Sequence, residues 1–128
     1  MTSSKDLGKI ARARLKDAEV LFAKNRFDGA VYICGYAVEV ILKRKICQRL
    51  NWAEYPISDS YKSFKTHNLD VLLHLSGKEA ILKSKCLAEW SFVFDLWNPE
   101  LRYQPIGKID RIKAQTMINY SKAIYRNL

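Results

Sequence analysis

Residues 26–43, RFDGAVYICGYAVEVILK, decide the fold because they predict one long helix that is apolar on almost every side. We expect this helix to start at Asp28, a good N-cap, and to end near Leu50. Such a helix is normally central and buried on several sides. The stretch therefore predicts a bundle of helices packed around this segment.

One face of this helix differs from the rest. A glycine inside a helix costs roughly 1 kcal/mol relative to alanine, so we expect Gly35 to let another backbone approach closely. Glu39 and Lys43 have ion-pair spacing, and we interpret them either as an intrahelical pair or as part of a polar spot that meets a ligand or Arg102. At i, i+3, i+4, i+7 and i+11 the face carries Tyr32, Gly35, Tyr36, Glu39 and Lys43.

Apolar residues at helical spacing predict four further helices. They cover residues 4–24, a short segment after Thr66, residues 78–96 and residues 108–127. No segment alternates with period two. The sequence therefore predicts an all-α, up-and-down bundle of about five helices in a single domain, residues 1–128.

The residues at the predicted helix ends support these boundaries. Ser3, Thr66 and Ser76 are expected N-caps, the first and last of them with an acid three residues later. Asn25 is an expected C-cap because asparagine tolerates the left-handed conformation. Asn98-Pro99 should end the fourth helix, because proline disfavours helix in the residue before it.

Residues 51–66 interrupt the helical pattern and predict a loop. We interpret its aromatic residues as anchors that pack on the core or form a dimer contact, with base stacking as the alternative. The aromatic and basic residues of this loop are Trp52, Tyr55, Tyr61, Phe64, Lys62 and Lys65.

The charge balance favours polyanionic partners. The 128 residues carry 22 Lys and Arg against 13 Asp and Glu, a formal net charge of +9. Such a domain attracts RNA, DNA, nucleotides, acidic proteins or an acidic membrane surface. Basic stripes on the first and last helices would form a phosphate-binding surface if the two stripes are adjacent in the bundle, and are otherwise solvated faces.

Several classes of site and location are excluded by what the sequence lacks. Cys34, Cys47 and Cys86 form no CxxC pair, so we expect reduced, mostly buried thiols of a cytoplasmic protein, with no zinc, other metal or cofactor. The chain has no P-loop, GxGxxG, HExxH or GxSxG motif. We also expect no signal peptide, because residues 1–6 contain no apolar stretch, and no membrane span, because no apolar run reaches about 18 residues.

Four pieces of sequence in this order resemble the HEPN domain family. They are an alanine-rich first helix, residues 26–43, Thr66-His67-Asn68-Leu69, and the segment 97–103, WNPELRY. The resemblance covers about residues 5–127. It implies a helical bundle that commonly forms a homodimer, and the small and tyrosine residues of the second helix are consistent with a dimer contact. It also implies links to nucleotides or RNA and a nucleotidyltransferase partner in toxin–antitoxin or defence modules.

Many HEPN proteins are metal-independent ribonucleases with an Arg followed four to six residues later by a His. Arg102 matches this Arg, but residues 106–108 are Ile, Gly and Lys, and no His follows His74. Arg102 could stabilise charge on phosphate, and His67 is the candidate base, with a packing role as its alternative. We interpret His74 as a partly buried packing residue.

Three functions are consistent with these features. The first is a non-enzymatic HEPN module that binds RNA, a nucleotide or a nucleotidyltransferase. The second is a divergent ribonuclease toxin that uses Arg102 and a histidine from elsewhere. The third is a purely structural dimerisation domain. The candidate ligand-binding residues are Arg102, Tyr103, Lys43, Glu39 and Tyr36.

Overall fold

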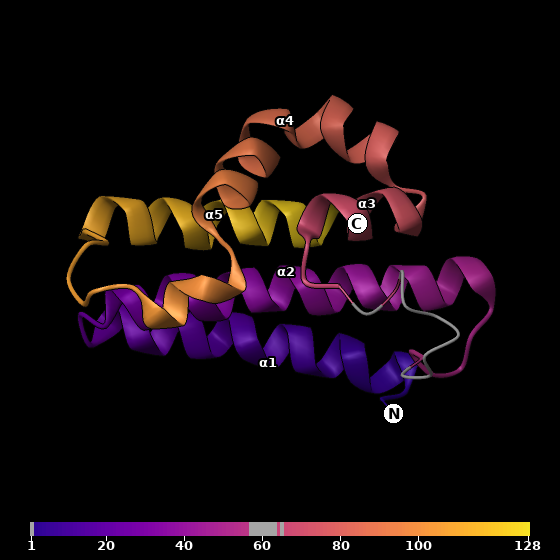
Figure 1. Cartoon of the computed structure of the whole chain (residues 1–128), viewed down its shortest axis with the longest axis horizontal. Helices are drawn as coiled ribbons and strands as arrows, with labels where there is room; N and C mark the ends of the chain where they lie inside the picture. The colour runs from indigo at the N-terminus through magenta and orange to yellow at the C-terminus, as the bar shows by residue number, and fades with distance from the viewer. Residues whose placement is uncertain (1, 57–63, 65) are drawn as a thin grey trace.

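The computed structural model describes residues 2–56, 64 and 66–128, except for the side chains of Pro99 and Arg102. These residues form five α-helices and one short 3-10 helix, with a single isolated bridge between Ser3 and Glu54 (Figure 1). The predicted all-α bundle of about five helices is therefore confirmed. The expectations for Tyr61, Lys62 and Lys65 fall on residues outside this description.

The first two helices form an antiparallel pair. Helix α1 spans Ser4–Ala23 and helix α2 spans Phe27–Leu50. The amide of Asp6 donates to the Ser3 hydroxyl at 3.1 Å, as expected of an N-cap. Asn25 has a φ of 59°, and this left-handed residue turns the chain from α1 into α2, as the sequence predicted.

Helix α2 lies at the centre of the bundle, as its apolar sequence predicted. It contacts α1, α3 and α5. Val31, Ala37 and Cys47 lie on different sides of it and are all buried. Although α2 is apolar almost all round, neither it nor any other helix within the described part of the chain is long and apolar enough to cross a membrane.

The remaining helices wrap back over α2. Helix α3 spans Leu69–Ser76 and helix α4 spans Glu79–Leu96, with a sharp corner between them at Gly77. The 3-10 helix η2 spans Pro99–Tyr103, and α5, Arg111–Asn127, then runs back beside α2. Figure 1 shows α4 slanting across α5, and α5 lying along the pair formed by α1 and α2.

Two predicted N-caps are wrong because their hydroxyls build a turn before the helix instead. The Thr66 hydroxyl accepts from the amide of Asn68, and Asn68 is the residue that caps α3. In the same way the Ser76 hydroxyl accepts from the amide of Lys78, and α4 begins only after Lys78. Hydroxyls bonded to an amide two residues on form such turns in competition with capping.

Gly35 lies directly beneath the ring of Trp97. A Cβ atom on Gly35 would come within 2.1 Å of the Trp97 ring. The indole N–H of Trp97 donates to the carbonyl of Tyr32 at 2.9 Å, and the side chain is 3% exposed. The expected close approach at Gly35 is thus present, but the neighbour is an indole and not a backbone. The small-residue face that we interpreted as a dimer contact is therefore occupied by the chain's own Trp97.

All three cysteines are buried and unpaired, as expected. Burial raises the pKa of the Cys34 thiol to about 12, with a weaker opposing effect from Ser121. These thiols therefore belong to the core of the bundle.

The contact between Gly35 and Trp97 predicts a specific cost for a methyl group at this position. Gly35→Ala should lower the free energy of unfolding by about 1–3 kcal/mol, because overpacking outweighs the gain of roughly 1 kcal/mol in helix propensity. Urea unfolding followed by circular dichroism measures this change. Gly29→Ala is the matched control, since its Cβ would lie 3.4 Å from Leu21, and it should be neutral or stabilising. Equal effects of the two substitutions would show that Trp97 does not occupy this position.

Candidate functional site

Glu39 is a carboxylate buried in the middle of α2. Its side chain is 2% exposed. Lys43, one turn later, donates from Nζ to Oε2 at 3.3 Å. His67, from the connection before α3, places Nδ1 2.7 Å from Oε1. A buried carboxylate is tolerated only when it is paired in this way, so these three residues form one polar cluster, named here the Glu39 cluster.

The contact with Glu39 determines which ring nitrogen of His67 carries a proton. A carboxylate oxygen can only accept a hydrogen bond, so Nδ1 is the donor. When the ring is neutral, Nε2 is then the acceptor nitrogen. The His67 side chain is 55% exposed. The arrangement therefore directs one nitrogen into the protein and leaves the ring accessible to a ligand.

The turn at the start of α3 positions His67. The amide of Asn68 donates to the Thr66 hydroxyl at 3.0 Å, and the Asn68 side chain caps the helix. His67 therefore precedes the helix, because Asn68 and not Thr66 is the N-cap. Instead of the packing role that we gave as its alternative, His67 makes a direct bond to Glu39.

Tyr55 closes the other side of the Glu39 cluster. The Lys43 ammonium lies 5.2 Å from the centre of the Tyr55 ring, a cation–π arrangement. The Tyr55 hydroxyl donates to the carbonyl of Phe64, and the side chain is 7% exposed. Burial, and then the nearby Cys47 and Glu39, raise the pKa of Tyr55 above its usual range. The aromatic residues of this loop that the structure describes thus pack on the core, as expected.

Aromatic rings connect the Glu39 cluster to η2. Tyr36 lies one turn before Glu39, and its ring meets that of Trp97 edge-on, with centroids 6.4 Å apart. Trp97 is followed by Asn98, whose side chain caps η2 through the amide of Glu100. The packing of Trp97 on α2 therefore fixes the start of the segment that carries Arg102 and Tyr103.

A pocket of about 290 Å³ lies between the start of α3 and the end of α4. His67 forms part of its wall, so the accessible ring opens towards this space. A pocket lined by one histidine, two asparagines and two aromatic rings offers hydrogen bonds and a stacking surface to a small polar ligand. Its lining residues are His67, Asn68, Leu69, Phe94, Trp97 and Asn98.

The structure brings some predicted site residues together and separates others. Tyr36, Glu39 and Lys43 share one face of α2, and His67 joins them. Tyr103 lies at the end of η2 and is 71% exposed, while the backbone of Arg102 lies within η2. His74 lies at the opposite end of α3 from His67. Its side chain is 77% exposed, so its interpretation as a partly buried packing residue is wrong.

Asp28 has a structural role that the sequence did not reveal. We expected it to cap α2, but α2 already begins at Phe27. The Asp28 carboxylate instead accepts from the amides of Gly107 and Ile109, at 2.7 and 3.3 Å. It therefore ties the connection before α5 to the start of α2. A groove of about 510 Å³ runs beside this contact, and Tyr32 is among its lining residues.

No group of three or more metal-ligating side chains occurs among residues 2–56, 64 and 66–128. The candidate site is instead built from one carboxylate, one histidine, one lysine and aromatic rings. Such groups can hold and orient polar or planar ligands and can move a proton.

Comparison with known proteins identifies a family, but no individual protein that is similar to this chain. The HEPN domain model matches residues 4–128. No curated protein and no solved structure matches the chain. The match covers nearly the whole chain, and it confirms the resemblance seen in the sequence.

The raised pKa of Tyr55 predicts how stability depends on pH. An unfolded tyrosine ionises near pH ~10, whereas the folded Tyr55 keeps its proton, so unfolding releases a proton above that pH. The free energy of unfolding should therefore fall by about 1.4 kcal/mol per pH unit above pH ~10 through this group alone. Tyr55→Phe removes the effect.

The measurement is urea unfolding of wild type and Tyr55→Phe from pH 7 to 11. Below pH ~9 the difference between them should be constant and near 1 kcal/mol, the contribution of the hydroxyl hydrogen bond. Above pH ~10 the difference should shrink. A difference that stays constant to pH 11 would mean that Tyr55 ionises in the folded protein.

Proposed function

Since the chain belongs to the HEPN family, we propose that it is a nucleotide- or RNA-associated binding module. It acts in a toxin–antitoxin or defence-type pair with a nucleotidyltransferase partner. HEPN domains often dimerise, and in this proposal the working form is a homodimer. The proposed ligand-binding residues are Arg102, Tyr103, Lys43, Glu39 and Tyr36, and we include His67 because it bonds to Glu39.

The observation that carries the proposal is the meeting of three segments on one face of α2. Glu39 bonds to Lys43 and to His67, and Tyr36 packs on Trp97, which leads into η2. Cationic, aromatic and hydrogen-bonding groups are thereby gathered in one region. These are the groups that bind phosphate, stack on bases and read base edges.

The charge of the chain supports a polyanionic ligand. A net charge of +9 attracts nucleic acid over long range. The two helices that carry basic stripes are neighbours, because α1 contacts α5. Lys122 of α5 pairs with Glu19 of α1, and the Arg111 guanidinium lies 4.8 Å from the ring centre of Phe22. This adjacency of the helices supports the proposal that their basic residues contribute to one polyanion-binding surface.

A metal-independent ribonuclease is the second candidate function, and the contact between Glu39 and His67 favours it. With Nδ1 bonded to Glu39, Nε2 of His67 could take the proton of a ribose 2′-hydroxyl. The 2′-oxygen would then attack the adjacent phosphorus as the bond to the 5′-oxygen breaks. The leaving 5′-oxygen would take a proton from water, and His67 would return its proton to the hydroxide that remains. Arg102 would stabilise the charge on phosphate. Against this candidate, residues 106–108 lack the histidine of the family motif.

One gel separates the candidate functions. Purified protein is mixed with end-labelled transfer RNA in chelator, and both retardation and cleavage are scored. A binding module should retard the RNA without cleaving it, and Arg102→Ala should weaken retardation roughly tenfold, the value of about one charge-assisted hydrogen bond. Lys24→Ala, which removes an exposed charge at the end of α1, is the control and should have a smaller effect.

The other outcomes of the gel are equally informative. Cleavage that is lost in both Arg102→Ala and His67→Ala would establish the ribonuclease and overturn the non-enzymatic proposal. Neither retardation nor cleavage would favour the third reading, a purely structural dimerisation domain.

A further inference from the structure

A second polar pocket lies where the corner between α3 and α4 meets the end of α2. Its volume is about 340 Å³. Three of its lining side chains are cationic, and none is acidic. The lining residues are Lys45, Gln48, Arg49, Ser76, Gly77 and Lys78.

Arg49 is held in a fixed position at this pocket. Its Nη1 donates to the carbonyl of Leu75 at 2.9 Å, at the end of α3. The side chain lies across Gly77, where a Cβ atom would come within 3.0 Å of Nε. Because Gly77 has a φ of 75° and no side chain, the guanidinium fits against the corner. A guanidinium carries five N–H donors in a fixed plane, and the carbonyl contact uses only those on one nitrogen.

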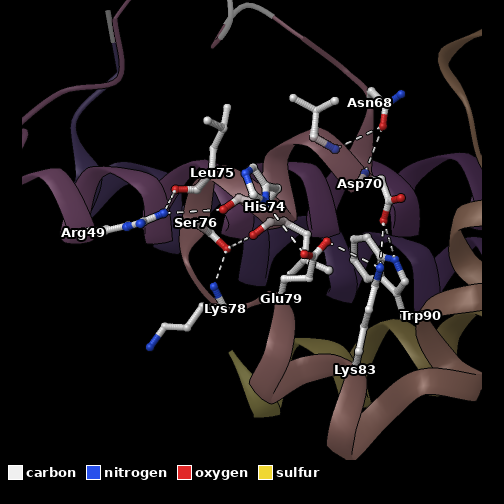
Figure 2. Close-up of polar contacts among 12 residues, drawn as sticks. Arg49, Asn68, Asp70, His74, Leu75, Ser76, Lys78, Glu79, Lys83 and Trp90 are labelled. Carbon is white, nitrogen blue, oxygen red and sulfur yellow. Dashed lines mark hydrogen bonds and ion pairs between the residues drawn. The ribbon is translucent and has the colours of Figure 1, made fainter.

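The two lysines bring further positive charge to the same place. Burial lowers the pKa of Lys45, and the positive charges of Lys78 and Arg44 lower it further. These cations are thus close enough to repel one another. Figure 2 shows Lys78 pointing to the same side of the corner as Arg49.

The acids of this corner lie on its other side. Glu79 is 3.5 Å from Lys83 and 3.7 Å from His74. Asp70 accepts from the Trp90 indole at 3.1 Å and lies 3.7 Å from Lys83. Figure 2 shows Asp70, Glu79, Lys83 and Trp90 together, apart from Arg49 and Lys78. The two acids are therefore paired with Lys83 and His74 on one side of the corner, and the cations that line the pocket lie on the other side.

We propose that this pocket binds a phosphate group. Arg49 would contact two phosphate oxygens with its planar donors, and Lys45 and Lys78 would supply point charges. The phosphate could come from a nucleotide or from the backbone of RNA, because the two offer the same anionic oxygens. The inference does not rest on the proposed function, since the pocket is lined by residues from the last turns of α2, and this end of α2 lies away from η2 (Figure 1).

The test is a titration of the full chain with inorganic pyrophosphate at constant ionic strength, followed by amide NMR. Wild type should show saturable shifts centred on residues 76–78. Lys45→Gln and Lys78→Gln should each weaken binding at least tenfold, the value of about one charge-assisted contact. Lys24→Gln, with the same charge change at an exposed site at the end of α1, should bind as wild type does. The lysines are chosen because Arg49 also holds the end of α3.

A competition with a short single-stranded RNA distinguishes the two sources of phosphate. Displacement of pyrophosphate by the RNA at these amides would support the proposal with the nucleic-acid backbone as ligand. Binding of pyrophosphate alone would support it with a nucleotide as ligand. Shifts in wild type that do not saturate, or an equal loss in Lys24→Gln, would overturn it, whatever the stability of the other variants.

Discussion

A carboxylate in the middle of the central, largely buried helix α2 constrains much of the structure around it. Glu39 cannot be buried alone, because an unpaired ionised group in a low-dielectric interior costs several kcal/mol. One partner, Lys43, comes from the same helix. The other, His67, comes from a different segment and must be brought to it. The requirement for a second partner thus ties the start of α3 to the centre of α2.

A second constraint acts on the same face of α2, one turn earlier. Because Gly35 has no side chain, the Trp97 ring can pack directly against the backbone of α2 at this position. The end of α4 is thereby fixed over α2, and η2 follows from that point. One face of α2 therefore positions both segments that carry candidate site residues. The contact between Glu39 and His67 positions the start of α3, and the packing of Trp97 on Gly35 positions η2.

The parts of this arrangement that depend on local sequence were predictable. The central position of α2 follows from its apolar residues, and the break after α4 follows from Asn98-Pro99. The pairing of Glu39 with Lys43 follows from their spacing. Local patterns failed where a side chain bonds to a distant part of the chain. Asp28 resembles a helix cap, but it binds amides near Gly107, a contact that no nearby residue indicates.

The bond between Glu39 and His67 joins residues 28 positions apart, and spacing alone could not have found it. The sequence did single out both residues, since residues 26–43, which include Glu39, and Thr66-His67-Asn68-Leu69 are among the segments that resemble the HEPN family. The resemblance does not predict that the two residues touch; that contact is seen only in the fold. The same holds for Arg49 and Lys78, which are unremarkable surface cations until the corner at Gly77 brings them together.

The central claim is that Glu39 and His67 stabilise each other, and a double-mutant cycle tests it most directly. Wild type, Glu39→Gln, His67→Ala and the double variant are unfolded in urea at pH 6. A coupling of about 1 kcal/mol is predicted, a moderate value because His67 is half exposed while Glu39 is buried. A coupling within about 0.3 kcal/mol of zero, the usual scatter for independent sites, would contradict the account.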